Sequence, residues 1–136
     1  MPLVSRKGIL AIAAVIDVAI NASKRPVSAK ALAARHKLPP RHLEPVLQAL
    51  VRDGILRGVR GPHGGYELAR ERRRISANDI LRAASTTEDA DDPPLPDSVL
   101  VTDVVRPALA DAERTFSTAL SRVSVEDMAK QAQALK

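Results

Sequence analysis

The side chains best suited to binding chemistry in this sequence are arginines beside a glycine-rich turn. Arg57 and Arg60 precede the segment GPHGG at residues 61–65. Guanidinium groups are permanently charged and donate paired hydrogen bonds to phosphate oxygens. The short runs at 55–59 and 66–68 contain β-branched and aromatic residues, and such runs around glycine and proline are typical of a β-hairpin. We therefore predict a basic hairpin, which either contacts a polyanion or is an ordinary surface hairpin.

Other residue types with catalytic or metal-binding potential lack a supporting pattern. His36, His42 and His63 fall in a predicted turn, helix and hairpin. No Ser/His/Asp set, phosphate loop or paired-acid motif accompanies them. The four carboxylates at 88–92 lack the spacing and glycine of a calcium loop. The chain has no cysteine, which excludes disulfides and thiolate sites. We therefore expect no catalytic residues, no metal, no cofactor and no enzyme.

Charge is distributed unevenly along the chain. Residues 1–74 contain 15 Lys and Arg against 5 Asp and Glu, a net charge of +10. Residues 75–136 contain 6 against 11, a net charge of −5. A basic amino-terminal half indicates contact with a polyanion such as double-stranded DNA, and the alternative is a basic surface that serves solubility.

Length and hydropathy favour one domain, or one domain with an appendage. Tyr66 and Phe116 are the only aromatic residues among the 136, so the core must be aliphatic. No apolar run approaches the roughly 20 residues that span a bilayer. The start MPLVSRKG is not followed by a signal-peptide pattern. We expect a cytoplasmic protein without a membrane partner.

Two helices joined by a tight turn are predicted before the hairpin. Ser28 is a suitable N-cap for the first, over 28–35. Prolines 39 and 40 suit the start of the second, and Gly54 is the expected left-handed residue beyond its end. This helix pair followed by a basic hairpin is typical of a winged helix-turn-helix. The apolar positions of the second helix are Leu43, Val46, Leu47, Leu50 and Val51.

The other side of the second helix is polar. Such side chains form hydrogen bonds with base edges or phosphates, and the alternative is a solvated helix surface. Pro45 interrupts the pattern, so either the regular helix begins close to Pro45 or a 3₁₀-like turn precedes it. The outward positions are Arg41, His42, Glu44, Gln48 and Arg52.

Further helices are predicted on both sides of this unit. An apolar helix over 5–23, capped at its first residue, is expected to be buried on more than one side. After the hairpin, the charged run 71–74 is either a solvated connection or a phosphate contact. Ser76 and Asp79 resemble a capping box, which predicts a short helix over 77–85.

The carboxyl-terminal third combines an acidic, proline-rich linker with a helix that carries an apolar seam. The seam has heptad-like spacing and indicates packing against another helix, either within the chain or, as we favour, in a second copy of it. Pro107 either begins or kinks this helix, and Ser124 caps a last one. The predicted dimer contacts are Val105, Leu109, Ala112, Phe116, Ala119 and Val123.

These patterns predict a mainly α fold with a small β-hairpin. The expected parts are a winged helix-turn-helix DNA-binding domain over 1–86, the linker over 87–98, and a dimerisation helix with a C-terminal helix over 99–136. A regulatory signal could come from a small-molecule effector between the first helix and the dimer helix, or from a protein effector bound to the linker.

The segment RGPHGGYELAR at 60–70 resembles the wing signature of the Rrf-two (Rrf2) family of bacterial transcription regulators. The resemblance extends over nearly the whole chain. Residues 26–56 resemble the family's helix-turn-helix, 75–83 its segment after the wing, and 121–128 its carboxyl-terminal turn and helix. The resemblance implies a dimeric winged-helix regulator that binds a roughly palindromic operator.

The resemblance also implies how DNA is contacted. The recognition helix would enter the major groove and the wing the minor groove, where narrow A·T-rich DNA has an enhanced negative potential that attracts Arg60. The wing glycines would allow close approach to the DNA backbone, and Tyr66 would pack at the base of the wing. The predicted DNA-binding residues are Arg41, His42, Glu44 and Gln48 in the helix and Arg57, Arg60, Gly61, His63, Gly64 and Gly65 in the wing.

Two departures from the family pattern affect the expected function. Cluster-binding members carry three cysteines before the dimer helix, and thiolates hold such clusters, so this sequence predicts a cluster-free regulator. Pro45 stands where many members have a polar residue able to contact bases, so their operator specificity does not transfer. A repressor is favoured, because occluding a promoter requires only occupancy. The alternative is a protein-interaction module on a winged-helix scaffold that has lost specific DNA binding.

Overall fold

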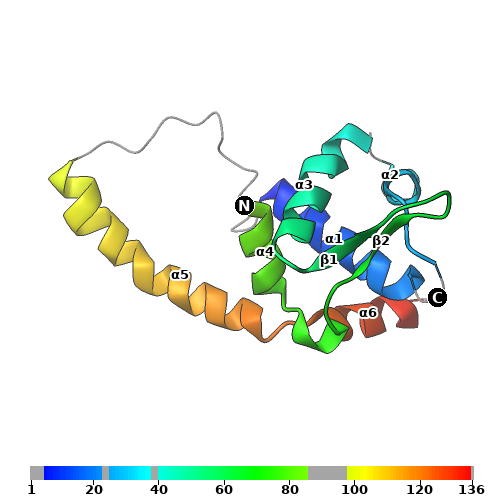
Figure 1. Cartoon of the computed structure of the whole chain (residues 1–136). Coiled ribbons are helices and arrows are strands. Elements are labelled where there is room, and N and C mark those ends of the chain that lie inside the picture. Colours follow the sequence, from blue (N-terminus) through cyan, green and yellow to red (C-terminus); the bar gives the residue numbers. More distant parts are fainter. Residues whose placement is uncertain (1–4, 23–24, 38–39, 86–97, 136) are drawn as a thin grey trace.

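The computed structural model describes residues 5–22, 25–37, 40–85 and 98–135 (Figure 1). It confirms a mainly helical fold with one two-stranded antiparallel sheet. All of the predicted linker except Ser98 lies outside the described residues. In chain order the elements are α1 (Arg6–Asn21), α2 (Ala29–His36), α3 (Pro40–Arg52), β1 (Leu56–Val59), β2 (Gly65–Leu68), the 3₁₀ helix η1 (Arg72–Arg74), α4 (Ala77–Ser85), the π-helix η2 (Leu100–Val105), α5 (Arg106–Ser121) and α6 (Val125–Ala134).

Side-chain caps begin four of these helices where the sequence predicts them. The hydroxyls of Ser5, Ser28 and Ser124 each accept a hydrogen bond of 3.0 Å from the backbone N–H three residues further on. Ser76 and Asp79 form a reciprocal capping box, with both N···O distances 3.1 Å. Each cap satisfies a backbone donor that the first helical turn leaves unpaired.

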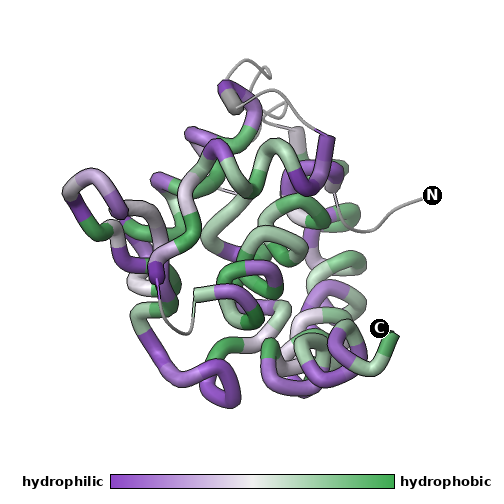
Figure 2. The backbone as a smooth tube through the Cα atoms, turned by 90° about the vertical axis from the view of Figure 1, so that its right-hand side faces the viewer, coloured by the Kyte–Doolittle hydropathy of each residue, from purple (hydrophilic) through white to green (hydrophobic). Residues whose placement is uncertain are grey.

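The core is aliphatic and is organised around α1. This helix contacts α3, α4, α6 and β2, which confirms its burial on more than one side. Val15, Leu32, Leu47 and Ile80 are fully buried, and Tyr66 packs against this cluster from the hairpin. Figure 2 shows hydrophilic residues gathered along loops and outer turns. In the described part of the chain, no helix combines the length and hydropathy needed to cross a bilayer.

Both predictions for Pro45, a helix that begins close to it or a 3₁₀-like turn before it, were wrong. The α-helix begins at Pro40 and continues through Pro45 to Arg52. Pro45 has no amide hydrogen to donate to the carbonyl of Arg41, and its exposed position near the helix start makes that loss tolerable. Val51, expected on the apolar side, is 38% exposed, whereas Ala49 is buried. The buried stripe of α3 therefore includes Ala49 rather than Val51.

The hairpin has the predicted position and a regular register. Leu56 pairs with Leu68 and Val59 with Gly65. Gly54 precedes β1 with φ +76°, the left-handed conformation expected beyond a helix. A further isolated bridge joins the α1–α2 loop to β2, because Val27 and Tyr66 exchange backbone hydrogen bonds of 2.9 and 2.7 Å. The hairpin is thus fastened to the loop that precedes the helix-turn-helix.

Helix α5 extends away from the rest of the chain (Figure 1). It begins at Arg106, directly after the π-helix, and Pro107 lies in its first turn. The backbone is already helical at Val105, so whether Pro107 begins or kinks the helix stays a prediction. It ends at Ser121, so Val123 lies beyond the helix that was predicted to contain it. The carbonyl of Val123 instead accepts a hydrogen bond of 2.7 Å from the amide of Ala77. That bond directs the chain back toward α4 and ends the seam early.

Helix α6 packs against α1 rather than continuing away with α5. Val125 and Ala129, four residues apart on one side of the helix, are buried. The amide of Val125 donates a hydrogen bond of 2.8 Å to the carbonyl of Ile75. The division of the chain at 86 and 98 stays a prediction, but its last helix contributes to the amino-terminal core.

Candidate nucleic-acid interface

Helix α3 presents a polar side opposite its buried stripe. Arg41, Glu44 and Gln48 are all exposed and follow one another at spacings of three and four residues, which places them on one side of the helix. His42 is also exposed, toward the edge of this side. Leu43 and Leu47 hold the opposite side in the core. The structure therefore brings the predicted recognition residues together on a helix that is itself firmly packed.

The wing arginines differ in what surrounds them. Arg57 lies directly opposite Glu67 in the hairpin register. Its Nη2 and Nε atoms lie 2.7 and 2.9 Å from Glu67 Oε1. Arg60 is exposed just beyond β1, and His63 is exposed in the turn. The guanidinium of Arg57 is thus paired with the carboxylate of Glu67, whereas Arg60 and His63 are exposed nearer the tip of the wing.

The wing glycines are required by the hairpin's own geometry. A Cβ atom on Gly65 would lie 2.5 Å from the carbonyl carbon and oxygen of Val27. A Cβ on Gly64 would collide with the carbonyl oxygen of Val59. Gly61 has φ +116°, which side-chain-bearing residues rarely adopt. From the sequence these glycines were related to the hairpin turn and to close approach to DNA. The Val27 contact was missed, because it depends on the tertiary fold.

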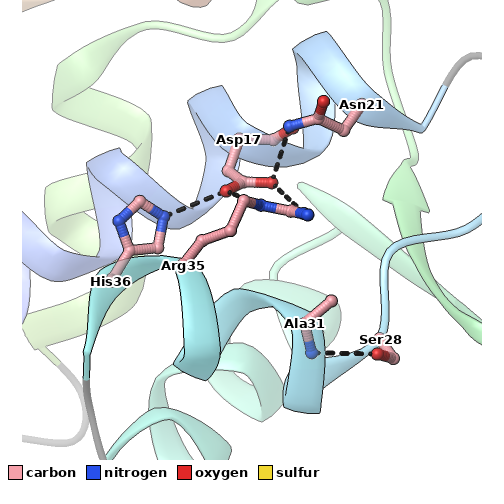
Figure 3. A network of polar contacts seen from close by, with 6 residues as sticks. All are labelled: Asp17, Asn21, Ser28, Ala31, Arg35 and His36. Carbon is pink, nitrogen blue, oxygen red and sulfur yellow. Dashed lines mark hydrogen bonds and ion pairs between the residues drawn. The ribbon is translucent and has the colours of Figure 1, made fainter.

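A buried carboxylate ties α1 to α2 (Figure 3). Asp17 is the buried charged residue of the described core, with a side chain only 6% exposed. Arg35 donates to both of its oxygens, from Nε at 2.8 Å and from Nη2 at 2.7 Å. Asn21 Nδ2 donates at 3.0 Å, and His36 Nε2 lies 3.0 Å from Oδ2. The carboxylate therefore fixes the end of α2 immediately before the turn into α3.

The electrostatics of this network favour the charged pair. Burial by itself would raise the pKa of Asp17, but hydrogen bonds from Arg35 and Asn21 outweigh it and lower that pKa below its usual value. The hydrogen bond to Asp17 raises the pKa of Arg35. Asp17 was not among the residues predicted from the sequence, although a lone acid within an apolar helix was the available signal.

The basic run after the wing is largely paired with acids. Arg72 Nε lies 2.7 Å from Glu126 Oε2 of α6, which joins the segment after the wing to the last helix. Arg73 and Arg74 are exposed and lie 2.7 and 3.9 Å from Glu71. This arrangement supports a solvated connection more than a phosphate contact.

The predicted dimer seam is open to solvent. Val105 and Leu109 are 41% and 54% exposed, Ala112 and Ala119 are exposed, and Phe116 is half-buried. A groove of about 660 Å³ with mainly apolar walls runs along the junction of η2 and α5. The described residues of this chain leave that side of the helix uncovered.

The sequence profile of the Rrf2 family, described as an iron-dependent transcriptional regulator, matches residues 4–131. The chain belongs to the Rrf2 family. An IscR structure from T. potens is 30% identical, with a TM-score of 0.75 over 99% of this chain and 91% of that one. CymR, the global cysteine regulator of B. subtilis, is 28% identical, with a TM-score of 0.71 over 96% and 98%.

Curated proteins similar in sequence are also transcriptional regulators, but they match a shorter part of this chain than the solved structures do. The transcriptional regulator IscR of Escherichia coli is 32% identical over 84 residues, which are 62% of this chain and 52% of that protein. About half the length of such curated relatives is covered by the match. These Rrf2 relatives are transcriptional regulators rather than enzymes, which confirms the expectation that the chain is not an enzyme.

The residues of this Rrf2 chain do not fit an iron–sulfur cluster. Such clusters are held by cysteine thiolates, and the sequence contains no cysteine. Over the residues that the structure describes, no three His, Asp or Glu side chains gather into a metal site. The carboxylates at 88–92 lie outside those residues. The family is described as iron-dependent, but this chain has no thiolates that could hold an iron–sulfur cluster.

Proposed function

We propose that this protein is a cluster-free, homodimeric repressor that binds a palindromic operator, with α3 in the major groove and the wing in the minor groove. The observation that supports this most directly is the exposed polar side of α3 beside an arginine-bearing hairpin, both held by one buried core. Membership in a family of transcription regulators supports the same proposal.

Each exposed side chain has a suitable DNA partner. Arg41 would donate to guanine and Gln48 would form two bonds with adenine, the commonest pairings of these residue types in the major groove. Glu44 would accept from cytosine. Arg60, at the wing tip, would enter a narrow minor groove. Together these contacts would discriminate among sequences, whereas phosphate contacts would position the protein.

The dimer is supported by the exposed seam of α5. Large apolar side chains such as Leu109 are rarely displayed in a row on a soluble monomer. A second copy related by a two-fold axis would cover them and would present two wings and two recognition helices to the two halves of an operator.

Binding of fluorescent duplexes tests the proposal. We expect duplex from the gene's own promoter region to bind much more tightly than random duplex, with an affinity that falls steeply as salt rises. Addition of the protein should also reduce transcription from that promoter in a purified system. Equal affinity for both duplexes would contradict sequence-specific regulation.

Charge reversal separates this proposal from a protein-interaction module. Arg41→Glu and Arg60→Glu place like charge against DNA, so we expect promoter binding and repression to be lost while the melting temperature is kept. Unchanged repression in both variants would favour the interaction module instead.

A further inference from the structure

A cleft of about 320 Å³ lies between the α1–α2 loop, α2 and the tip of the wing. Its walls include Arg25, Arg35 and His63, and all three side chains carry N–H donors. None of the described residues that line it is acidic. The walls of the cleft therefore carry several hydrogen-bond donors and positive charge, which suit a phosphate group.

The two sides of the cleft are fixed relative to one another. The backbone bridge between Val27 and Tyr66 fastens the loop to the hairpin, and Gly65 packs directly on Val27. Arg25 lies two residues before Val27, and His63 lies two residues before Gly65. Both donors are therefore carried on backbone segments whose separation is set by the fold rather than by chance approach of two loops.

Arg35 is already oriented by Asp17. Two of its five guanidinium hydrogens are directed to the Asp17 carboxylate, which leaves three for another acceptor. Its side chain is 44% exposed and lines the cleft. The buried carboxylate thus acts as a positioning group for Arg35. By contrast, the side chain of exposed Arg25 has no hydrogen bond or ion pair with any residue that the structure describes.

We propose that this cleft holds a backbone phosphate of the duplex, with Arg25 as the principal donor and Arg35 and His63 as additional ones. The inference rests on the proposed function. Helix α2 contacts α3 on one side and shares the cleft with the wing tip on the other. A duplex with α3 in its major groove and the wing in the adjacent minor groove must place one phosphodiester strand between them, and this strand passes the cleft.

Salt titrations of Arg25→Gln test the phosphate contact. Because each neutralised phosphate contributes about 0.9 to the slope of log affinity against log salt, we expect the slope to become shallower by about two for a dimer. At about 0.15 M salt this corresponds to binding roughly 30-fold weaker, equally for promoter and random duplex. Lys130→Gln, which removes an exposed charge from α6, is the matched control and should leave the slope unchanged.

Methylphosphonate substitution identifies the phosphate itself. We expect one neutralised linkage beside the groove of the wing to weaken binding of the wild-type protein much more than binding of Arg25→Gln, since that variant has already lost the principal donor to this phosphate. Additive losses at every linkage, or a wild-type slope in Arg25→Gln, would overturn the inference.

Two further outcomes separate this inference from its alternatives. Calorimetry with inorganic phosphate on the protein–duplex complex should give no binding at the cleft; binding that Arg25→Gln abolishes would assign the cleft to a free anion and overturn the duplex assignment. If the wild-type protein prefers its promoter, but the effects of the methylphosphonate linkage and of Arg25→Gln simply add, only the cleft inference fails. If it shows no preference, the proposed function fails.

Discussion

The elements from α1 to α4, here called the winged-helix unit, differ from helix α5 in where their apolar residues lie. In the unit, Leu43, Leu47 and Leu50 are buried and the exposed side of the same helix is polar. In η2 and α5 no described residue is buried, and Leu100 and Leu109 are 64% and 54% exposed. Burial of apolar surface drives both folding and association. The unit buries its apolar side chains within one chain, whereas the exposed apolar side chains of η2 and α5 support the proposed contact with a second copy.

The largest expected effect is in the core of the unit. Leu47→Ala removes a fully buried side chain, and we expect the free energy of unfolding to fall by about 3 kcal/mol. Denaturant titration followed by circular dichroism measures this. Val51→Ala, on the same helix but 38% exposed, is the control and should cost about 0.5 kcal/mol. Equal losses would contradict the burial difference between the two positions.

The second prediction concerns the exposed helix. Leu109→Glu places a charge on the seam, and we expect the dimer to dissociate about 30-fold more readily, or about 2 kcal/mol. Sedimentation equilibrium measures the association, while the helix content of the winged-helix unit should be unchanged. Thr118→Glu adds the same charge at an exposed position on the opposite side of the helix, where no seam position lies three or four residues away, and should leave association intact. Dimers of normal affinity in Leu109→Glu would remove the seam from the interface.

The third prediction concerns the polar contact inside the unit. Asp17→Asn removes the charge that holds Arg35, and we expect a loss of about 1–2 kcal/mol at neutral pH, discounted because Arg35 is 44% exposed. The folded pKa of Asp17 is lowered, so its contribution is complete above about pH 4 and is lost as pH falls through the folded pKa. Unfolding measured across that range should show the wild type and Asp17→Asn converging in acid.

Exposed Asp111, which pairs with Arg114 on α5, supplies the control for that experiment. Asp111→Asn should have almost no effect on stability, because exposed ion pairs contribute little. A difference between wild type and Asp17→Asn that stays constant into acid would mean that the Asp17 charge is not the source of the effect.

The smallest expected effect is at the wing. Glu67→Gln releases Arg57 from its cross-strand partner, so we expect DNA affinity to rise about threefold at low salt and the gain to shrink at high salt. Fluorescence anisotropy with promoter duplex measures it. Glu113→Gln, on α5, is a charge-matched control. Unchanged affinity in Glu67→Gln would indicate that Arg57 faces away from the duplex.

Much of the fold was predictable because its signals are local. The caps at Ser5, Ser28 and Ser124, the capping box at Ser76 and the left-handed Gly54 were all expected from neighbours within a few residues. The recognition side of α3 was predictable for the same reason, since helical spacing alone separates polar from apolar positions. Pro45 was misjudged, because the surrounding helix tolerates one missing hydrogen bond where packing supports it.

By itself the sequence determined the helices, the hairpin and the residue types that face outward, because capping, turn geometry and periodicity act over one or two turns of chain. Three facts were decided only by the tertiary structure. Asp17 pairs with Arg35, which lies 18 residues further along the chain. Gly65 must be glycine because a Cβ atom there would collide with the backbone of Val27, and α6 packs back against α1. Those facts depend on how elements distant in sequence pack together, and no local pattern encodes such distances.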